Sequence, residues 1–262
     1  MNRAPIVFID SGIGGLPYLE WIKKRLPEES FVYIADNKNF PYGTKTKESL
    51  KKIMYDLMAE LCSLYNPKAA VIACNTASVI SLEYLREHFT IPIIGVVPAV
   101  KPAAFQAGKK RIGLMASDRT IEDSYTEKLI EDHASDCIVY RWPGNEIIDF
   151  IENRLYGSKK DEIAEVLKPA VDFFTENEVD NVVLGCTHFL FLEDYLTEML
   201  GGLSLIDSRE GVGNQIIRIL KKHRLLSDKK SSDLFILTGA ADDFSRKENY
   251  NWISEKYGLC TV

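Results

Sequence analysis

The feature that most constrains the fold of this chain is an alternation of short apolar runs with longer amphipathic segments. Nine runs are rich in Val and Ile, are nearly continuous in hydrophobicity and usually end in a small or polar residue. They occupy residues 5–10, 31–36, 69–74, 91–97, 111–117, 137–142, 181–186, 203–207 and 234–239. Such runs are typical of strands that are buried on both faces of a parallel sheet.

Between these runs, apolar residues recur at the three- and four-residue spacing of one helix face. The clearest examples are residues 50–65, 162–174 and 212–220. Because strands and helices alternate over the whole length, we predict an α/β fold with parallel sheets.

Nine strands can form one sheet or two. Pro98 and Pro102 favour a domain boundary after the fourth strand, and a second crossing is expected near residues 208–211. We therefore predict a first α/β domain of residues 1–97 with a returning segment 210–262. Residues 98–209 are predicted to form a second α/β domain inserted between them.

Composition and charge exclude several classes of protein. The chain is 46% hydrophobic and 27% charged, which is typical of a globular protein. A net charge of −6 without a basic run gives no reason to expect nucleic acid as a partner. No apolar stretch is long enough to span a membrane, and the first residues lead into a strand without the apolar region of a signal peptide. We expect a cytoplasmic protein.

The five cysteines do not form a pattern typical of disulfides or zinc. Their number is odd, and no Cys-x-x-Cys pair occurs. Cys62, Cys137 and Cys260 are interpreted as small buried packing residues. Cys74 and Cys186 differ because each follows directly on an apolar run.

Ligands of open α/β sheets bind just beyond the carboxyl ends of the strands. Three apolar runs end in residues able to do chemistry, in segments 10–15, 74–76 and 186–188. The last two share one pattern, which is an apolar strand, a cysteine, small polar residues and a helix. Two α/β domains related by a pseudo-twofold axis would place Cys74 and Cys186 opposite each other across a cleft.

Two opposed thiols suit racemisation. The reaction removes a proton from one face of a tetrahedral carbon and returns a proton to the other face, so two groups serve better than one. A thiol with a pKa near ~8.5 can act as either acid or base close to neutral pH. We expect Asp10 to lie beside Cys74 and His188 beside Cys186 as helpers in proton transfer.

Polar residues that follow the two cysteines are expected at helix N-cap positions, where free backbone N–H groups suit a carboxylate. These residues are Asn75, Thr76 and Thr187. Asp10 has an alternative interpretation as a cap of the helix that follows it. The glycines of segment 12–15 do not have the spacing of a dinucleotide-binding loop.

Five segments, taken together and in order, resemble the glutamate racemases of the aspartate/glutamate racemase superfamily. They are DSGIGGL (10–16), NFPYGTKT (39–46), ACNTAS (73–78), GVVPAVKPA (95–103) and LGCTHF (184–189). The resemblance implies two Rossmann-like (flavodoxin-like) domains with the active site in the cleft between them. It also implies no cofactor, no metal, a homodimer, and formation of D-glutamate for peptidoglycan, and so for the cell wall and cell shape.

The resemblance assigns roles to individual residues. The catalytic residues would be Cys74, Cys186, Asp10 and His188. The substrate-binding residues would be Asp10, Ser11, Tyr42, Gly43, Asn75, Thr76, Thr120, Thr187 and His188.

The chain departs from the family pattern at several places in the second domain. Arg119 stands where the family has a glycine, and Trp142-Pro143-Gly144 replaces a cysteine-containing strand end. Leu190 stands where a proline is usual. The acidic residue expected after this strand is either Glu146 or Glu152.

Other functions remain open. A hydrolase would use Cys186 as nucleophile and His188 as base but would leave Cys74 without a role. A metal site built from Asp10, Cys74, Cys186 and His188, and a binding module without activity, are further alternatives. Among racemases, one specific for aspartate or a related amino acid differs from one specific for glutamate by as little as one methylene group.

Overall fold

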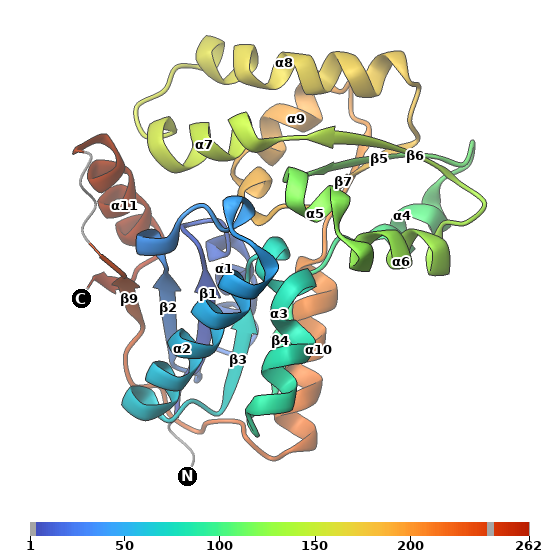
Figure 1. The fold of residues 1–262 in the computed structure, drawn as a ribbon. Coiled ribbons are helices and arrows are strands. Elements are labelled where there is room, and N and C mark those ends of the chain that lie inside the picture. The colour runs from blue at the N-terminus through green and yellow to red at the C-terminus, as the bar shows by residue number, and fades with distance from the viewer. Residues whose placement is uncertain (1–3, 240–243, 262) are drawn as a thin grey trace.

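Two parallel β-sheets organise the chain (Figure 1). The structure is a computed structural model that describes residues 4–239 and 244–261. The first sheet has the order β10-β9-β2-β1-β3-β4, and the second has the order β6-β5-β7-β8. The first sheet contains β1 (Ile6–Asp10), β2 (Phe31–Ala35), β3 (Ala69–Ile72), β4 (Ile93–Gly95), β9 (Leu234–Leu237) and β10 (Cys260–Thr261). The second contains β5 (Arg111–Ala116), β6 (Ile138–Pro143), β7 (Asn181–Leu184) and β8 (Ser204–Ile206).

The two sheets repeat one topology. Strands β2-β1-β3-β4 and β6-β5-β7-β8 both follow the order second, first, third, fourth, and all neighbours are parallel. In such sheets the strand order reverses between the first and third strands, where ligands bind. Cys74 follows β3 and Cys186 follows β7, so the two cysteines lie at equivalent places in the two sheets.

The sequence predicted these sheets well. Each of the nine apolar runs overlaps one strand, and the α/β fold with parallel sheets is confirmed. The strand that was not predicted, β10, is two residues long and has no apolar run around it. Strand β9 lies beside β2 in the first sheet, and β10 lies beside β9 at its edge. The exact domain boundaries stay a prediction. The predicted first domain also includes residues 1–3, 240–243 and 262, which lie outside the described residues.

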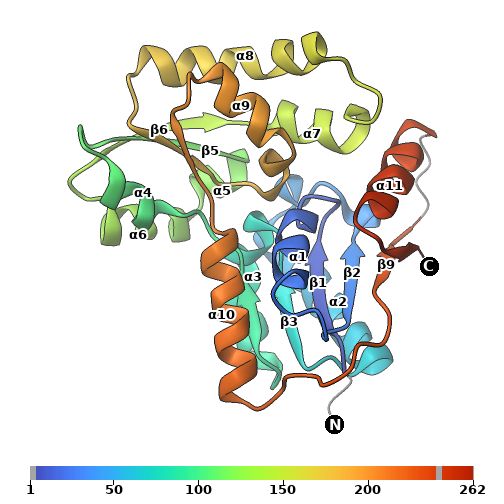
Figure 2. The same cartoon turned by 180° about the vertical axis from the view of Figure 1, so that it is seen from behind.

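Helices cover both faces of the sheets. In the first sheet, α2 and α3 lie in front in Figure 1, and α1 and α10 lie in front in the reverse view of Figure 2. The α-helices are α1 (Leu16–Lys23), α2 (Lys47–Tyr65), α3 (Asn75–His88), α4 (Val100–Gln106), α5 (Asp118–Glu122), α6 (Ser124–His133), α7 (Asn145–Arg154), α8 (Lys160–Glu176), α9 (Glu193–Met199), α10 (Arg209–Lys222) and α11 (Phe244–Lys256). The 3₁₀ helices are η1 (Asn37–Asn39), η2 (Tyr42–Thr44) and η3 (Thr187–Leu192).

Strand β1 shows why its sequence is continuously apolar. Successive side chains of a strand point to opposite faces. Ile6 and Phe8 belong to the core under α1, whereas Val7 and Ile9 belong to the core under α2 and α3. Both faces are therefore buried, as the uninterrupted apolar run predicts.

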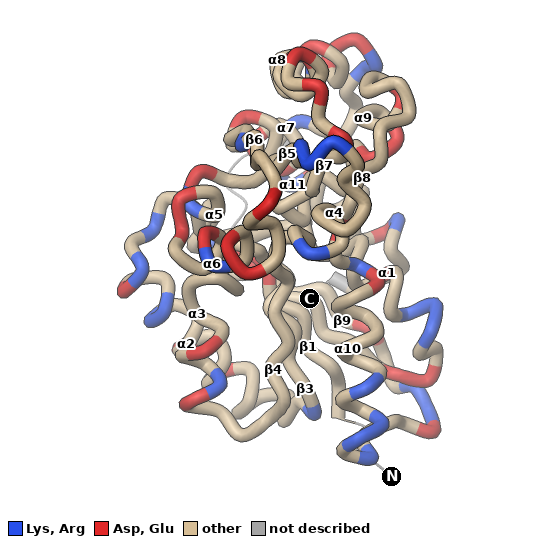
Figure 3. The backbone as a smooth tube through the Cα atoms, turned by 90° about the vertical axis from the view of Figure 1, so that its right-hand side faces the viewer, with Lys and Arg blue, Asp and Glu red and all other residues tan. Residues whose placement is uncertain are grey.

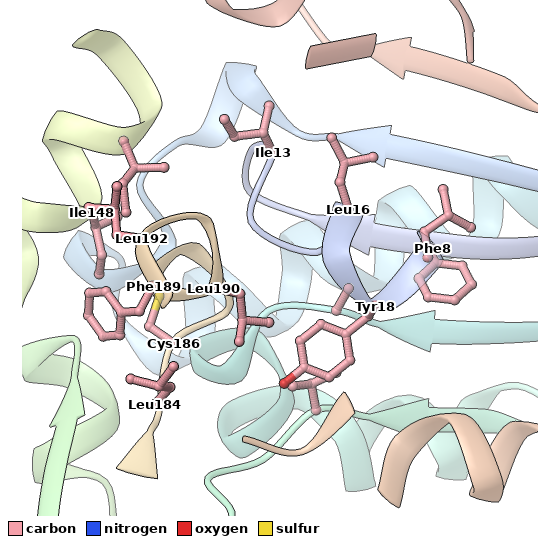
Figure 4. Packing of buried hydrophobic residues seen from close by; sticks show 14 of the residues in the cluster. Phe8, Ile13, Leu16, Tyr18, Ile148, Leu184, Cys186, Phe189, Leu190 and Leu192 are labelled. Carbon is pink, nitrogen blue, oxygen red and sulfur yellow. The ribbon is translucent and has the colours of Figure 1, made fainter. Parts of the chain in front are cut away.

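A shared core joins the two sheets near the strand ends. Figure 4 shows Cys186 among Leu184, Phe189 and Leu190 of β7 and the η3 segment that follows it, and it shows Ile13 just before α1 and Leu16 at the start of that helix, which packs on the first sheet. These residues belong to one buried cluster. Each fully buried Leu, Ile or Phe contributes about 1.5–3 kcal/mol. The packing therefore holds the β7–η3 connection, which carries Cys186, against the first sheet.

A buried ion pair fastens the returning segment to the opposite end of the first sheet. Lys68 Nζ lies 2.5 Å from Glu29 Oε2, and both side chains are almost fully buried. Lys68 also donates to the carbonyl of Leu225 at 2.8 Å, and the Ser227 backbone N–H donates to Glu29 at 2.7 Å. These bonds provide partners for both charges. They connect the segment before β9 to the segments that lead into β2 and β3.

The outer surface carries charges of both signs. Lys and Arg segments alternate with Asp and Glu segments around the outer helices (Figure 3). Within the described part of the chain, no helix combines the length and the apolar character needed to cross a bilayer.

Candidate active site

A small cavity lies where the carboxyl ends of the two sheets meet. Its volume is about 230 Å³, below the ~300–1,000 Å³ of sites that hold drug-sized ligands, which fits a small metabolite. Both Cys74 and Cys186 line it. The other lining residues are Ser11, Phe40, Pro41, Tyr42, Gly43, Thr44, Thr76, Ser117, Asp118, Arg119, Asn145, Ile148, Asp149 and His188.

Two larger hollows, of about 760 and 600 Å³, lie elsewhere on the described residues. One is formed by residues of α7, α8 and α11, and the other by residues near α4 and α10. Neither is lined by a cysteine. Their size reflects open surface, whereas the smaller cavity alone joins the two strand-end cysteines.

Cys74 occupies the N-cap position of α3. Burial raises the pKa of its thiol well above the usual value, and the nearby Asp10 carboxylate raises it further. The backbone N–H groups of Ala77 and Thr76 act in the opposite direction because they stabilise the thiolate. Cys74 is thus a neutral thiol in the ligand-free protein, with N–H groups in place to receive its negative charge.

Cys186 and His188 form the other half of the site. The Cys186 sulfur lies 3.6 Å from His188 Nδ1, and His188 Nε2 lies 2.7 Å from Glu152 Oε2. Burial lowers the pKa of His188, but the hydrogen bonds with Cys186 and Glu152 raise it more, well above the usual value. The imidazole therefore carries a positive charge between a sulfur and a carboxylate.

Glu152 is fully buried and is held by three donors. Besides His188, the backbone N–H of Ile13 donates to it at 3.3 Å, and the Tyr250 hydroxyl also donates to it. Burial raises the pKa of Glu152, but these bonds, that from His188 first, bring it below the usual value. Of the two acidic residues that the sequence left open, Glu152 lies at the site and Glu146 is exposed on α7.

Asp10 connects the two halves. Its Oδ1 accepts from the Ser11 backbone N–H at 2.6 Å, and its Oδ2 accepts from the Thr187 hydroxyl at 3.1 Å. Burial raises the pKa of Asp10 to about 6, and the negative charge of Glu152 adds to this rise. The charge of Asp10 raises the pKa of Cys74, and the expected placement of the two side chains side by side stays a prediction. No cap of α1 by a side chain is present, so the alternative role of Asp10 as a helix cap is wrong.

The glycines of segment 12–15 allow the first sheet to approach these groups. A Cβ on Gly12 would lie 2.1 Å from Glu152, and one on Gly14 would lie 2.4 Å from Thr187 and 2.5 Å from His188. Only glycine fits at these two positions. The glycine pattern thus serves close packing across the two sheets.

The predicted substrate-binding residues divide into two groups. Ser11, Tyr42, Gly43, Thr76 and His188 line the cavity. Asp10, Asn75, Thr120 and Thr187 are buried behind the lining residues. The Thr120 hydroxyl supports the wall through bonds of 3.1 Å to Thr76 and 3.0 Å to Ser117.

Asn75 is a special case within the second group. Its side-chain amide is buried, and neither its nitrogen nor its oxygen has a hydrogen-bond partner among the described residues. Buried polar groups are nearly always paired, so this amide stands out among the side chains behind the cavity wall.

Two predictions about local positions were wrong. Asn75, Thr76 and Thr187 do not occupy N-cap positions, because the cysteines themselves do. Cysteine has no N-cap preference, so the cap rule selects the polar residue one position later. The interpretation of the other cysteines as buried was also wrong, since Cys62 and Cys137 are partly exposed and Cys260 is exposed.

The departures in the second domain have structural explanations. Leu190 is buried in the shared core. Trp142 packs on Phe173, with ring centroids 5.1 Å apart, and takes no part in the cavity wall. Gly144 allows Phe189 to approach closely. Arg119 lines the cavity.

Comparison with known proteins agrees with this arrangement. Residues 18–210 match the Asp/Glu/Hydantoin racemase family. The chain is 38% identical over 236 residues to the glutamate racemase of Shewanella halifaxensis, which covers 89% of this chain and 87% of that protein. This chain belongs to the Asp/Glu/Hydantoin racemase family.

Solved racemase structures share the whole fold of this racemase. The glutamate racemase of Escherichia coli, in complex with L-glutamate and the activator UDP-MurNAc-ala, aligns with a TM-score of 0.87 and 32% identity. The alignment covers 98% of this chain and 97% of that one. The glutamate racemase of Francisella tularensis, in complex with D-glutamate, aligns with a TM-score of 0.80 and 25% identity over 98% and 94% of the two chains.

Several lining residues of this racemase were not predicted from the sequence. They come from the segment between η1 and the end of η2, from the β5–α5 connection with the start of α5, and from α7, and they are Phe40, Pro41, Thr44, Ser117, Asp118, Asn145, Ile148 and Asp149. Glu152 was one of two alternatives. A signal was available for Ser117, which follows β5 as Ser11 follows β1. For Ile148 and Asp149, which lie within helix α7, the sequence offers no such signal.

Proposed function

We propose that this protein is a glutamate racemase that interconverts L- and D-glutamate with two thiols and without a cofactor. One observation carries the proposal. Cys74 and Cys186 line the same small cavity, and each follows the third strand of its sheet. Relatives with 38% identity and solved structures that hold L- or D-glutamate support glutamate as the substrate.

The reaction needs one proton-transferring group on each face of the α-carbon. The thiolate of one cysteine takes the α-proton, and the electron pair of the C–H bond passes to the carbon and its carboxylate. The thiol of the other cysteine then gives its proton to the opposite face. The product has the inverted configuration, and the two cysteines have exchanged protonation states.

The surroundings of the two sulfurs differ. Cys186 lies beside the imidazole of His188, and Glu152 holds the other nitrogen of that ring. The pKa of Cys74 is raised, so its thiol is protonated before the substrate binds and can donate its proton to the α-carbon. Asp10, with its pKa of about 6, accepts the proton when Cys74 is to act as base.

Polar groups of the wall bind the two charged ends of the amino acid. The free N–H groups at the start of α3 suit a carboxylate. Ser11, Tyr42, Gly43 and Thr76 contact the substrate in this proposal, and Asn75 turns its unpaired amide towards it. Asp10, Thr120 and Thr187 hold these groups in position.

We further propose that the D-glutamate supplies peptidoglycan synthesis and thereby cell-wall formation and cell shape. A cytoplasmic location and a homodimer stay proposals of the family resemblance.

Two competing functions give different results with the same variants. We expect wild type to convert each enantiomer of glutamate to the racemic mixture in polarimetry, with L-aspartate converted far more slowly. Cys74→Ser and Cys186→Ser should each reduce racemisation by orders of magnitude, whereas the control Cys62→Ser, outside the cavity, should not. A hydrolase would keep its turnover in Cys74→Ser, and an aspartate racemase would show the opposite substrate preference.

A further inference from the structure

Arg119 places an unpaired cationic side chain in the wall of the cavity. Its Nε atom is buried and has no hydrogen-bond partner among the described residues. Nη2 makes one long hydrogen bond, of 3.3 Å, to the carbonyl of Lys45. An arginine is always charged and has five N–H donors in a fixed fork. Leaving a buried donor of a charged group unpaired is costly, so its presence points to a missing acceptor.

The other charged side chains of the wall already have hydrogen-bond partners. His188 is the second cationic lining residue, and Glu152 pairs with it. Asp118 accepts a hydrogen bond from Asn145, and Asp149 accepts one from Asn153 at 2.7 Å. Arg119 is therefore the cation of the lining that is available to an anionic ligand.

The exposure of the lining residues distinguishes the deep end of the cavity from its mouth. Cys74 and Cys186 are 7% and 9% exposed, whereas Arg119 is half-buried and its neighbour Asp118 is exposed. The cysteines thus lie at the deep end and Arg119 nearer the mouth. A substrate whose α-carbon lies between the two sulfurs would extend its side chain towards Arg119.

We propose that Arg119 binds the side-chain carboxylate of the substrate and so selects acidic amino acids. The inference rests on the proposed function and adds a specificity-determining residue to it. A guanidinium and a carboxylate match in geometry and form paired, charge-assisted hydrogen bonds. The bond to Lys45 leaves Nε and the remaining donors for this contact.

The test compares two variants of Arg119 with a structural control. Arg119→Gln removes the charge, and Arg119→Lys keeps the charge but loses the fork. Lys47→Met is the control because Lys47 makes the other link between the same two segments, an ion pair of 2.8 Å with Asp123, and does not line the cavity. The readouts are KM and kcat for glutamate, and inhibition by norvaline, which has no side-chain carboxylate.

We expect Arg119→Gln to raise the KM of glutamate by about 10- to 100-fold while inhibition by norvaline stays within about twofold. Arg119→Lys should recover part of the loss. Lys47→Met should leave unchanged the ratio of the KM of glutamate to the inhibition constant of norvaline. The inference is overturned if Arg119→Gln leaves the KM of glutamate unchanged, or weakens glutamate and norvaline equally. Wild type that neither binds nor converts glutamate would instead overturn the proposed function.

Discussion

Replacing Asp10 by asparagine is expected to stabilise the fold at neutral pH while it removes most of the racemase activity. Asp10 is fully buried, and its carboxylate receives hydrogen bonds only from Ser11 and Thr187 among the described residues. Asparagine has the same shape and can keep both bonds, because the Thr187 hydroxyl can accept as well as donate. The variant therefore loses a buried charge and little else.

The magnitude follows from the pKa. Burial raises the pKa of Asp10 from 3.8 to about 6, so the folded protein holds this proton more tightly than the unfolded chain. At neutral pH, ionising the folded state therefore costs about 3 kcal/mol relative to the unfolded state. The stability that protonated Asp10 contributes is fully present below pH 3.8 and is lost as the pH rises through about 6.

Thermal unfolding followed by circular dichroism measures this difference. A gain of about 3 kcal/mol at neutral pH corresponds to a rise in Tm of roughly 6–12 °C for a chain of this size. The gain should shrink as the pH falls below about 6. Asp132→Asn, on the exposed surface of α6, is the matched control and should change the stability by less than about 0.5 kcal/mol.

Two results would refute this reasoning. One is a Tm for Asp10→Asn equal to or below that of wild type at neutral pH. The other is a gain that does not depend on pH, which would show that the ionisation of Asp10 is not its cause.

Three further substitutions test other parts of the structure. Glu152→Gln leaves the His188 proton without its anion and should lower kcat by on the order of 100-fold in steady-state assays, with an unchanged far-ultraviolet spectrum; full activity would contradict the role of this pair. Gly14→Ala should cost about 1–3 kcal/mol of stability in denaturant titrations and abolish turnover, whereas Gly108→Ala, where a Cβ meets nothing, should do neither. Lys68→Met leaves a buried carboxylate without its cation and should destabilise the protein by about 3–5 kcal/mol in the same titrations, so that a loss below about 1 kcal/mol would count against the buried pair.

Most of the fold could be predicted from the periodicity of the sequence. The continuous apolar run of β1 indicates burial on two faces, and the structure buries Val7 and Phe8 in different cores. The missed strand β10 pairs through only two residues, Cys260 and Thr261, and owes its place to β9. A strand that depends on its neighbour alone leaves no pattern in the sequence.

The site could be predicted only where residues follow strand ends. Cys74 and Cys186 were found in this way, because the carboxyl ends of parallel strands are the binding edge of such sheets. Glu152 and Ile148 lie within a helix, and they reach the site because α7 packs against the η3 segment. Contacts between the two sheets depend on tertiary packing, which the spacing of residues along the chain does not encode.

The most direct test of the two-thiol mechanism is the position of the label when L-glutamate is converted in D₂O and followed by proton NMR at low conversion. With two separate bases, the D-glutamate formed carries deuterium at the α-carbon, while the remaining L-glutamate keeps its proton. Cys74→Ser and Cys186→Ser should both lose this labelled product, and Cys62→Ser should retain it. D-glutamate that keeps the original proton, or a wild-type labelling pattern that survives in either active-site variant, would contradict the mechanism.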